Sequence, residues 1–134
     1  MMEYTHLNYS CRGPVATIEL NAPQTLNAFD EAMCDELSAA LQDAGTDSSI
    51  RSVVLTGAGK IFSSGGDIKE MASACRNGDN IFDVTVTKLD HAVRQIVTMP
   101  KPVVASVFGA VYGAAYNLAL ACDFCIASED ASFC

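Results

Sequence analysis

Positive charge is scarce in this sequence. Eight Lys and Arg stand against sixteen Asp and Glu, which gives a formal net charge of −8 over 134 residues. This balance opposes non-specific binding to nucleic acid or to an acidic membrane surface, so polyanions are not expected as partners. A small anionic ligand is still compatible with it, because a few local donors can outweigh the overall field at short range.

Long apolar runs are missing as well. The uninterrupted apolar stretches fall far short of the roughly 20 residues that a helix needs to cross a bilayer, so no membrane-spanning segment is predicted. Half of the residues are nevertheless hydrophobic. The chain is therefore long enough for one domain with a core and too short for two ordinary domains.

Clusters of metal ligands are also lacking. The chain has only two histidines, His6 and His91, and the pair Cys122 and Cys125 has no second pair near it in the sequence, although its spacing fits half of a zinc or redox motif. No secretory segment is expected ahead of the cysteines. We therefore expect reduced, structural thiols, a cytoplasmic location and no metal site. The six cysteines are Cys11, Cys34, Cys75, Cys122, Cys125 and Cys134.

Hydrophobic periodicity alternates between strand-like and helix-like segments, which predicts an α/β fold. A hairpin with a turn at residues 11–14 is expected to open the chain. Residues 51–57 have the pattern of a strand in a parallel sheet that helices cover on both faces. The predicted strands are 4–10, 15–20, 51–57 and 103–107, and the predicted helices are 27–44, 67–75, 81–98 and 116–121. The apolar residues expected to share one face of a helix are Met33, Leu37, Ala40, Leu41 and Ala44 in the first long helix, and Val86, Leu89, Val93 and Val97 in the second.

Two adjacent glycines, Gly65 and Gly66, lie just before the helix predicted at 67–75. Without side chains, their NH groups are accessible to a ligand, and NH groups at a helix N-terminus can stabilise negative charge on an oxygen. The turn is therefore a candidate oxyanion hole, and an ordinary strand-to-helix turn is the alternative. A second turn of small residues, 108–115, precedes another helix. If both strands lie in one sheet, one NH from each turn could hold the same oxygen.

The order of several short segments adds a resemblance. These segments are Asn21-Ala22-Pro23, Leu26-Asn27-Ala28, Val54-Leu55-Thr56-Gly57, the run from Phe62 to Met71, Lys101-Pro102-Val103-Val104-Ala105, Gly113, and Leu118-Ala119-Leu120-Ala121-Cys122-Asp123. Together they resemble the enoyl-CoA hydratase/isomerase family, or crotonase superfamily, over essentially the whole chain. The resemblance implies a spiral of ββα units and acyl-CoA thioester substrates. It also implies no cofactor besides the CoA of the substrate, and a homotrimer or hexamer for the full-length form.

The resemblance also assigns residues to a site. The donors that hold the thioester carbonyl oxygen would be the NH groups of Gly66 and Ala114. Asp67 is expected to cap its helix, and Lys60, Lys69 and Lys101 are candidates for contacts with CoA phosphates or are solvated surface lysines. The implied substrate-binding residues are Leu26, Ala28, Ser64, Gly66, Asp67, Ile68, Lys69, Gly113 and Ala114. Ala22 and Gln24 stand where the family often carries basic residues.

Asn117 occupies the position at which hydratases of this family have the first of two glutamates. An amide cannot act as a general base, and the second glutamate would lie three residues past Cys134. This difference favours an isomerase over a hydratase. The alternative for Asn117 is that it has no role in catalysis and is a helix residue that only hydrogen-bonds a neighbour. Because family members are about twice this length, we expect residues 1–134 to be the N-terminal part of a single crotonase-like domain. Alone, this part is expected to be inactive, with exposed apolar surface and an open sheet edge. A truncated acyl-CoA-binding protein without catalysis is the alternative function.

Overall fold

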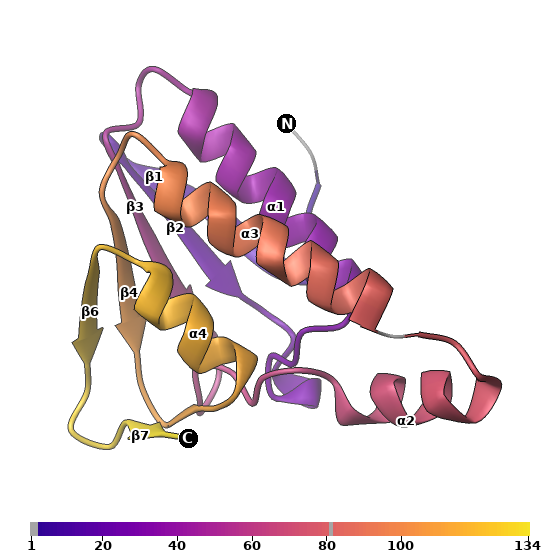
Figure 1. Cartoon of the computed structure of the whole chain (residues 1–134). Helices are drawn as coiled ribbons and strands as arrows, with labels where there is room; N and C mark the ends of the chain where they lie inside the picture. The colour runs from indigo at the N-terminus through magenta and orange to yellow at the C-terminus, as the bar shows by residue number, and fades with distance from the viewer. Residues whose placement is uncertain (1–2, 81) are drawn as a thin grey trace.

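The computed structural model describes residues 3–80 and 82–134 and shows a mixed sheet with helices against it (Figure 1). The five strands are ordered β1-β2-β3-β4-β6. β1 and β2 form an antiparallel hairpin, whereas β2, β3, β4 and β6 run parallel. The bounds are β1 Leu7–Arg12, β2 Val15–Leu20, β3 Ser52–Gly57, β4 Val103–Val107 and β6 Phe124–Ala127. A second, short sheet pairs β5 Ala110–Val111 with β7 Ser132–Phe133.

The helices provide the crossovers that parallel strands require. They are α1 Glu31–Thr46, α2 Ile68–Asn77, α3 Thr87–Thr98 and α4 Ala114–Ala121, with a 3₁₀ turn at Pro23–Thr25 and a π-helical turn at Phe82–Val86. α1 and α3 lie side by side over the sheet, and α2 extends away from the body of the molecule (Figure 1). None of the residues of α2 is buried. In the part of the chain that the structure describes, no helix is long and apolar enough to span a membrane.

The sheet buries one face only. Ile18, Leu55 and Ala105 lie in register across β2, β3 and β4 and are fully buried. The residues that alternate with them, such as Val54 and Thr56, are half-buried. The prediction that residues 51–57 are buried on both faces is therefore wrong, because α1, α3 and α4 pack on the same side of this sheet.

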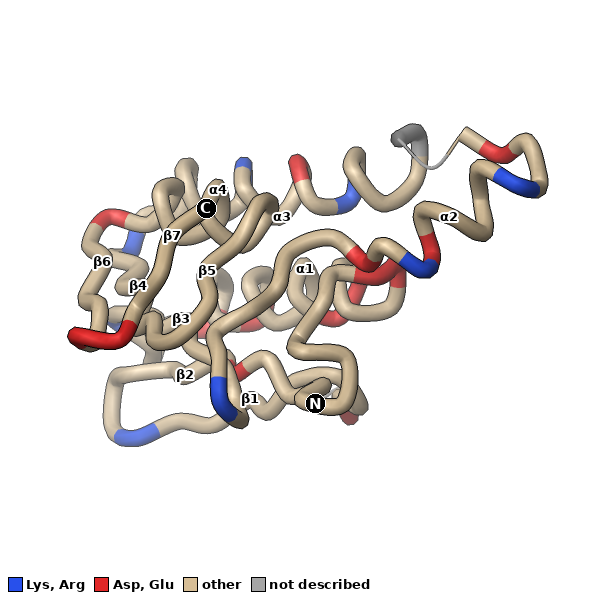
Figure 2. The backbone as a smooth tube through the Cα atoms, turned by 90° about the horizontal axis from the view of Figure 1, so that it is seen from below, with Lys and Arg blue, Asp and Glu red and all other residues tan. Residues whose placement is uncertain are grey.

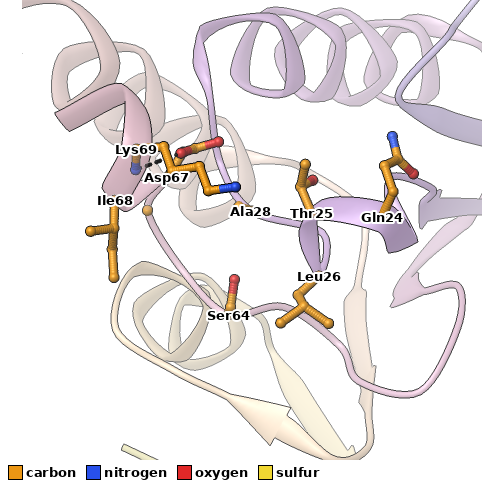
Figure 3. Close-up of a pocket in the computed structure, with 9 residues that line it drawn as sticks. Gln24, Thr25, Leu26, Ala28, Ser64, Asp67, Ile68 and Lys69 are labelled. Carbon is orange, nitrogen blue, oxygen red and sulfur yellow. Dashed lines mark hydrogen bonds between the residues drawn. The ribbon is translucent and has the colours of Figure 1, made fainter. Parts of the chain in front are cut away.

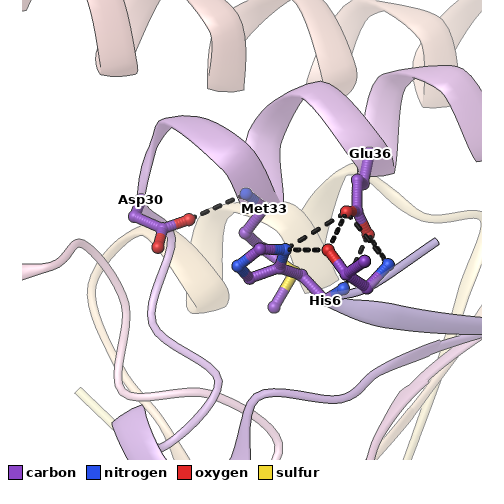
Figure 4. Close-up of polar contacts among 5 residues, drawn as sticks. His6, Asp30, Met33 and Glu36 are labelled. Atoms are coloured by element: carbon purple, nitrogen blue, oxygen red, sulfur yellow. Dashed lines mark hydrogen bonds and ion pairs between the residues drawn. The ribbon is translucent and has the colours of Figure 1, made fainter.

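α1 begins later than predicted. Residues 27–30 are not helical, because Asn27 has a left-handed φ of 53° and Asp30 caps the helix, its Oδ1 accepting the Met33 NH at 2.7 Å (Figure 4). The predicted apolar face of α1 is confirmed, and Gly45 lies inside the helix rather than past its end. β2 and β4 have the predicted bounds, whereas others differ by a few residues: β1 is shifted to Leu7–Arg12, α2 continues to Asn77, and α4 starts at Ala114.

The helix predicted at 81–98 is divided in the structure. The π-helical turn precedes α3, and Ile81 lies outside the described residues. The buried stripe of α3 is formed by Ala92 and Ile96, with Leu89 and Val93 packed partly against the core. Val86 and Val97 are exposed, so their assignment to the buried face is wrong. Val86 lies three residues before Leu89 and Val97 lies four residues after Val93, so helical spacing alone does not separate them from this stripe.

Glu36 on α1 fixes the segment that precedes β1. Its carboxylate accepts hydrogen bonds from the NH groups of Thr5 and His6, the latter at 2.7 Å, and from the Thr5 hydroxyl at 2.7 Å (Figure 4). Burial by itself would raise the pKa of Glu36, but these donors outweigh burial and lower the pKa to about 2. The ionised carboxylate is therefore part of the folded structure.

An apolar surface is exposed around β6, which is an edge strand of the sheet. All four residues of β6 are exposed, and Phe124 and Ile126 each keep 65% of their surface accessible. Leu120 on α4 and Phe133 on β7 are exposed as well. The expectation of exposed apolar surface and an open sheet edge is therefore confirmed for the described residues.

Candidate functional site

The loop with two glycines is held by bonds to three other segments. Ser63 pairs with the β5 strand, because its NH donates to the Ala110 carbonyl and its carbonyl accepts from Tyr112, both at 3.2 Å. The Ser64 NH donates to the Leu26 carbonyl at 3.0 Å. Further along, the Gly65 carbonyl accepts the Phe29 NH at 2.8 Å, and the Asp67 NH donates to the Phe29 carbonyl. The backbone of this loop is therefore fixed before α2 begins.

These bonds set the direction of the Gly66 NH. In a trans peptide the C=O and the following NH point in opposite directions. Since the Gly65 carbonyl points at Phe29, the NH of Gly66 points away from it. Among the described residues, no protein group accepts a hydrogen bond from this NH.

The Ala114 NH is free for a different reason. Ala114 is the first residue of α4, where a backbone NH has no partner within the helix. The NH groups before and after it are used: Gly113 donates to the Cys134 carbonyl at 2.7 Å, and Ala115 donates to the Tyr112 carbonyl at 3.0 Å. Within residues 3–80 and 82–134, nothing accepts the Ala114 NH.

The two loops touch at Gly65. A Cβ atom placed there would lie 2.6 Å from the Tyr112 carbonyl oxygen and 3.4 Å from the Ala114 nitrogen. Gly65 also has a φ of +94°, a conformation that favours glycine. Any other residue at this position would push the loops apart. The sequence-based expectation that the two turns converge agrees with this contact.

A cavity of about 340 Å³ opens beside Gly66 (Figure 3). In Figure 3 the side chains of Ile68 and Leu26 lie on opposite sides of this space, with Ser64 between them. Leu26 and Ile68 are large apolar side chains that are 52% and 78% exposed. The cavity is lined by Gln24, Thr25, Leu26, Ala28, Ser64, Gly66, Asp67, Ile68 and Lys69. A partly apolar cavity of this size fits a small organic ligand.

Seven of the predicted site residues line this cavity, and Gly113, Ala114 and Asn117 do not. Sequence reasoning missed Thr25, and it noted Gln24 only as a residue at a position where the family often carries a basic one. Pro23 at the first position of the 3₁₀ turn was the available signal, because proline favours the start of a helical turn and this turn brings both residues to the cavity.

The charged residues near the cavity have distinct surroundings. Asp67 caps α2 as predicted, since its Oδ1 accepts the NH groups of Lys69 and Glu70. Lys69 lines the cavity, and Lys60 lines a smaller one that shares Leu26 with it. Lys101 lines neither of these cavities and donates to the carbonyls of Ala44 and Asp47 at the end of α1. Figure 2 shows Lys and Arg scattered singly along the backbone.

Asn117 lies on α4, three residues after Ala114, and is exposed. Its NH continues the helix by donating to the Gly113 carbonyl. Its side chain bonds no protein group in the described part of the chain.

The cysteines form no pairs. All six are free thiols, and burial raises the pKa of Cys34 and of Cys122 to about 12 each. Thiols with such pKa values are protonated at neutral pH and poorly nucleophilic. Across the described residues, no group of three or more His, Cys, Asp or Glu side chains is arranged to hold a metal ion.

Comparison with known proteins identifies the family. The family of enoyl-CoA hydratases/isomerases matches residues 11–134. A trans-2-decenoyl-[acyl-carrier-protein] isomerase of Streptococcus mutans is 37% identical, with 98% of this chain and 51% of that protein covered. A probable enoyl-CoA hydratase of Rhodobacter capsulatus is 39% identical, with 98% and 49% covered. The crystal structure of an enoyl-CoA hydratase/isomerase from Xanthobacter autotrophicus is 36% identical with a TM-score of 0.86, with 98% of this chain and 49% of that chain covered.

The chain thus spans about half the length of the curated relatives it matches. Over that half, the predicted crotonase-like α/β fold is confirmed by neighbours with TM-scores of 0.90 and 0.91. Because the family match extends from residue 11 to residue 134 and the fold agrees with it, this chain belongs to the enoyl-CoA hydratase/isomerase family.

Proposed function

We propose that this chain binds an acyl-CoA thioester with the carbonyl oxygen between the NH groups of Gly66 and Ala114. The observation that carries the proposal is a pair of NH groups that find no acceptor among the described residues, in two loops that touch at Gly65. The cavity beside Gly66 would take the part of the ligand next to the thioester.

The chemistry that such a pair supports is removal of a proton from the carbon next to the carbonyl. This step moves negative charge onto the carbonyl oxygen, and two fixed donors stabilise the resulting enolate. The loss of one such donor typically costs about 3 kcal/mol of transition-state stabilisation. The proposed reaction class is therefore that of an enoyl-CoA isomerase or hydratase.

Isomerisation is the preferred member of this class. The support for it is Asn117, an exposed amide on α4 at the position where family resemblance places a hydratase glutamate. An amide can orient a substrate but cannot take up a proton at neutral pH. Relatives with either activity in their names match this chain, so the preference depends on Asn117.

A second candidate function is thioester binding without turnover. The observation that favours it is the scarcity of carboxylates in the cavity wall, because Asp67 is the only Asp or Glu among the described lining residues. One of its oxygens already accepts two NH groups of α2. A carboxylate in that role is held as a helix cap and is poorly placed to move a proton.

A pair of ligands that differ only at the carbonyl tests the proposal. In ¹H–¹⁵N spectra of the chain, acetyl-CoA should shift the amide resonances of Gly66 and Ala114 together and with one dissociation constant. S-Ethyl-CoA, a thioether without the carbonyl oxygen, should shift the residues around the cavity and leave these two amides nearly unchanged. Equal shifts with both ligands, or none at these amides, would refute the assignment.

A further inference from the structure

Two polar side chains are fully buried in the described part of the chain, and both lie next to the candidate site. Asn27 and Ser63 have no accessible surface. Polar groups are buried at a cost unless they are hydrogen-bonded, so a buried pair of this kind points to a role in fixing local structure.

The Ser63 hydroxyl connects two backbone segments. Its Oγ donates to the Asn27 carbonyl at 2.7 Å and accepts the Gly65 NH at 3.1 Å. The backbone of the same residue is bonded to Ala110 and Tyr112, just before Ala114. Ser63 therefore joins the cavity wall, the loop with two glycines and the segment that leads into α4.

Asn27 holds the other end of this connection. Its Oδ1 accepts the Ala22 NH at 2.8 Å, and its Nδ2 donates to the carbonyls of Ala58 and Phe62 at 2.9 and 3.1 Å. The Asn27 carbonyl to which Ser63 donates is thus itself fixed. Because Asn27 follows Leu26 and precedes Ala28, the same bonds also fix one wall of the cavity.

We propose that Ser63 is a positioning residue for the Gly66 and Ala114 donors. Gly65 is held at both ends, its NH by the Ser63 hydroxyl and its carbonyl by the Phe29 NH. The Gly65 carbonyl belongs to the same peptide group as the Gly66 NH, so a fixed Gly65 fixes the direction of that NH. Without the hydroxyl, a glycine with wide conformational freedom would be held at one end only. This inference rests on the proposed function, because it names what orients the proposed donors.

The test compares Ser63→Ala with Thr56→Val. Thr56 also donates its hydroxyl to a backbone carbonyl, that of Ser106 at 2.8 Å, but it lies on β3 and lines neither cavity near the site. Without ligand, Ser63→Ala should speed hydrogen exchange of the Gly65 amide about tenfold and shift the Gly66 and Ala114 resonances. Thr56→Val should leave all three amides as in the unchanged protein.

The ligand pair then separates positioning from stability. Ser63→Ala should lower the preference for acetyl-CoA over S-ethyl-CoA about tenfold, whereas Thr56→Val should keep it. Ser63→Cys keeps a weak donor and acceptor in place of the hydroxyl, so its preference for acetyl-CoA should lie between those of Ser63→Ala and Thr56→Val. It also replaces Ser63→Ala in the test if Ser63→Ala fails to fold.

The inference is overturned if the Gly66 and Ala114 amides of Ser63→Ala or Ser63→Cys match those of the unchanged protein. It is also overturned if the preference between the ligands falls equally in Thr56→Val. Should the unchanged protein show no preference at all, the proposed function fails, and the exchange of Gly65 without ligand alone decides whether Ser63 orients the loop.

Discussion

Acid should remove a defined part of the stability of this protein through Glu36. The pKa of Glu36 falls from its ordinary 4.5 to about 2 in the folded chain, because the NH groups of His6 and Thr5 and the Thr5 hydroxyl outweigh the effect of burial. At about 1.4 kcal/mol for each tenfold change, this difference is worth about 3 kcal/mol of folding free energy. The Glu36 side chain is 16% exposed and its donor residue Thr5 is exposed, so solvent screening reduces the expected contribution to about 2 kcal/mol.

The direction follows from proton binding. A group with a lowered pKa in the folded state binds fewer protons there than in the unfolded chain, so its contribution is complete above pH 5 and is lost as the pH falls toward 2. Glu36→Gln should therefore lower the free energy of unfolding by about 2 kcal/mol at pH 7. At pH 2 the difference between the two proteins should shrink to less than about 1 kcal/mol.

Urea unfolding followed by circular dichroism between pH 7 and pH 2 measures both numbers. Glu129→Gln is the matched control, because Glu129 is exposed in the turn between β6 and β7 and its substitution should change stability by less than about 0.5 kcal/mol. A difference for Glu36→Gln that stays constant over this pH range, or one as small as that of the control at pH 7, would refute the reasoning.

Three further results are expected. Asn27→Ala should destabilise the fold by about 3 kcal/mol or more in urea unfolding, because the buried Ala22 NH loses its acceptor and the carbonyls of Ala58 and Phe62 lose their donor. A loss of stability below about 1 kcal/mol would contradict the hydrogen-bond assignment. Phe124→Ser combined with Ile126→Thr should reduce self-association in sedimentation experiments and the binding of an apolar dye, because both side chains are 65% exposed on an edge strand. Unchanged self-association would show that another surface is responsible. The 134-residue chain should neither hydrate nor isomerise an enoyl-CoA in an absorbance assay, since no free carboxylate lines the described cavity. Robust turnover would contradict the claim that a carboxylate is needed and missing.

The strands that the sequence predicts best are those with clear boundaries. β2 and β4 have the predicted bounds, because runs of β-branched residues are bounded there by Gly13, Pro14 and Pro102. The start of α1 was missed, since helical spacing continues through Asn27, whose left-handed φ depends on the bonds of its buried side chain. The open face of the sheet also could not be predicted, because a strand pattern does not say which elements pack on its second face.

In the candidate site, too, the features set by local sequence could be predicted and those set by contacts between distant segments could not. The run of two glycines and a capping Asp67 could be predicted, because glycine and N-cap residues have local conformational roles. Ser63 was missed, since the sequence gives its hydroxyl no partner, and its acceptor belongs to Asn27, 36 residues earlier. Contacts between distant segments determine which of two neighbouring serines is buried and which lines the cavity.

The carbonyl resonance of bound acetyl-CoA tests the central claim most directly. With ¹³C at the thioester carbonyl, two NH donors should move this resonance downfield on binding, because hydrogen bonds polarise the C=O group. Ala114→Pro removes one donor at the first helical position, where proline is well tolerated and the NH bonds no described protein group. We predict a downfield shift in the unchanged protein that is clearly smaller in folded Ala114→Pro. A bound carbonyl that resonates as it does in free acetyl-CoA, or equally in both proteins, would contradict the account.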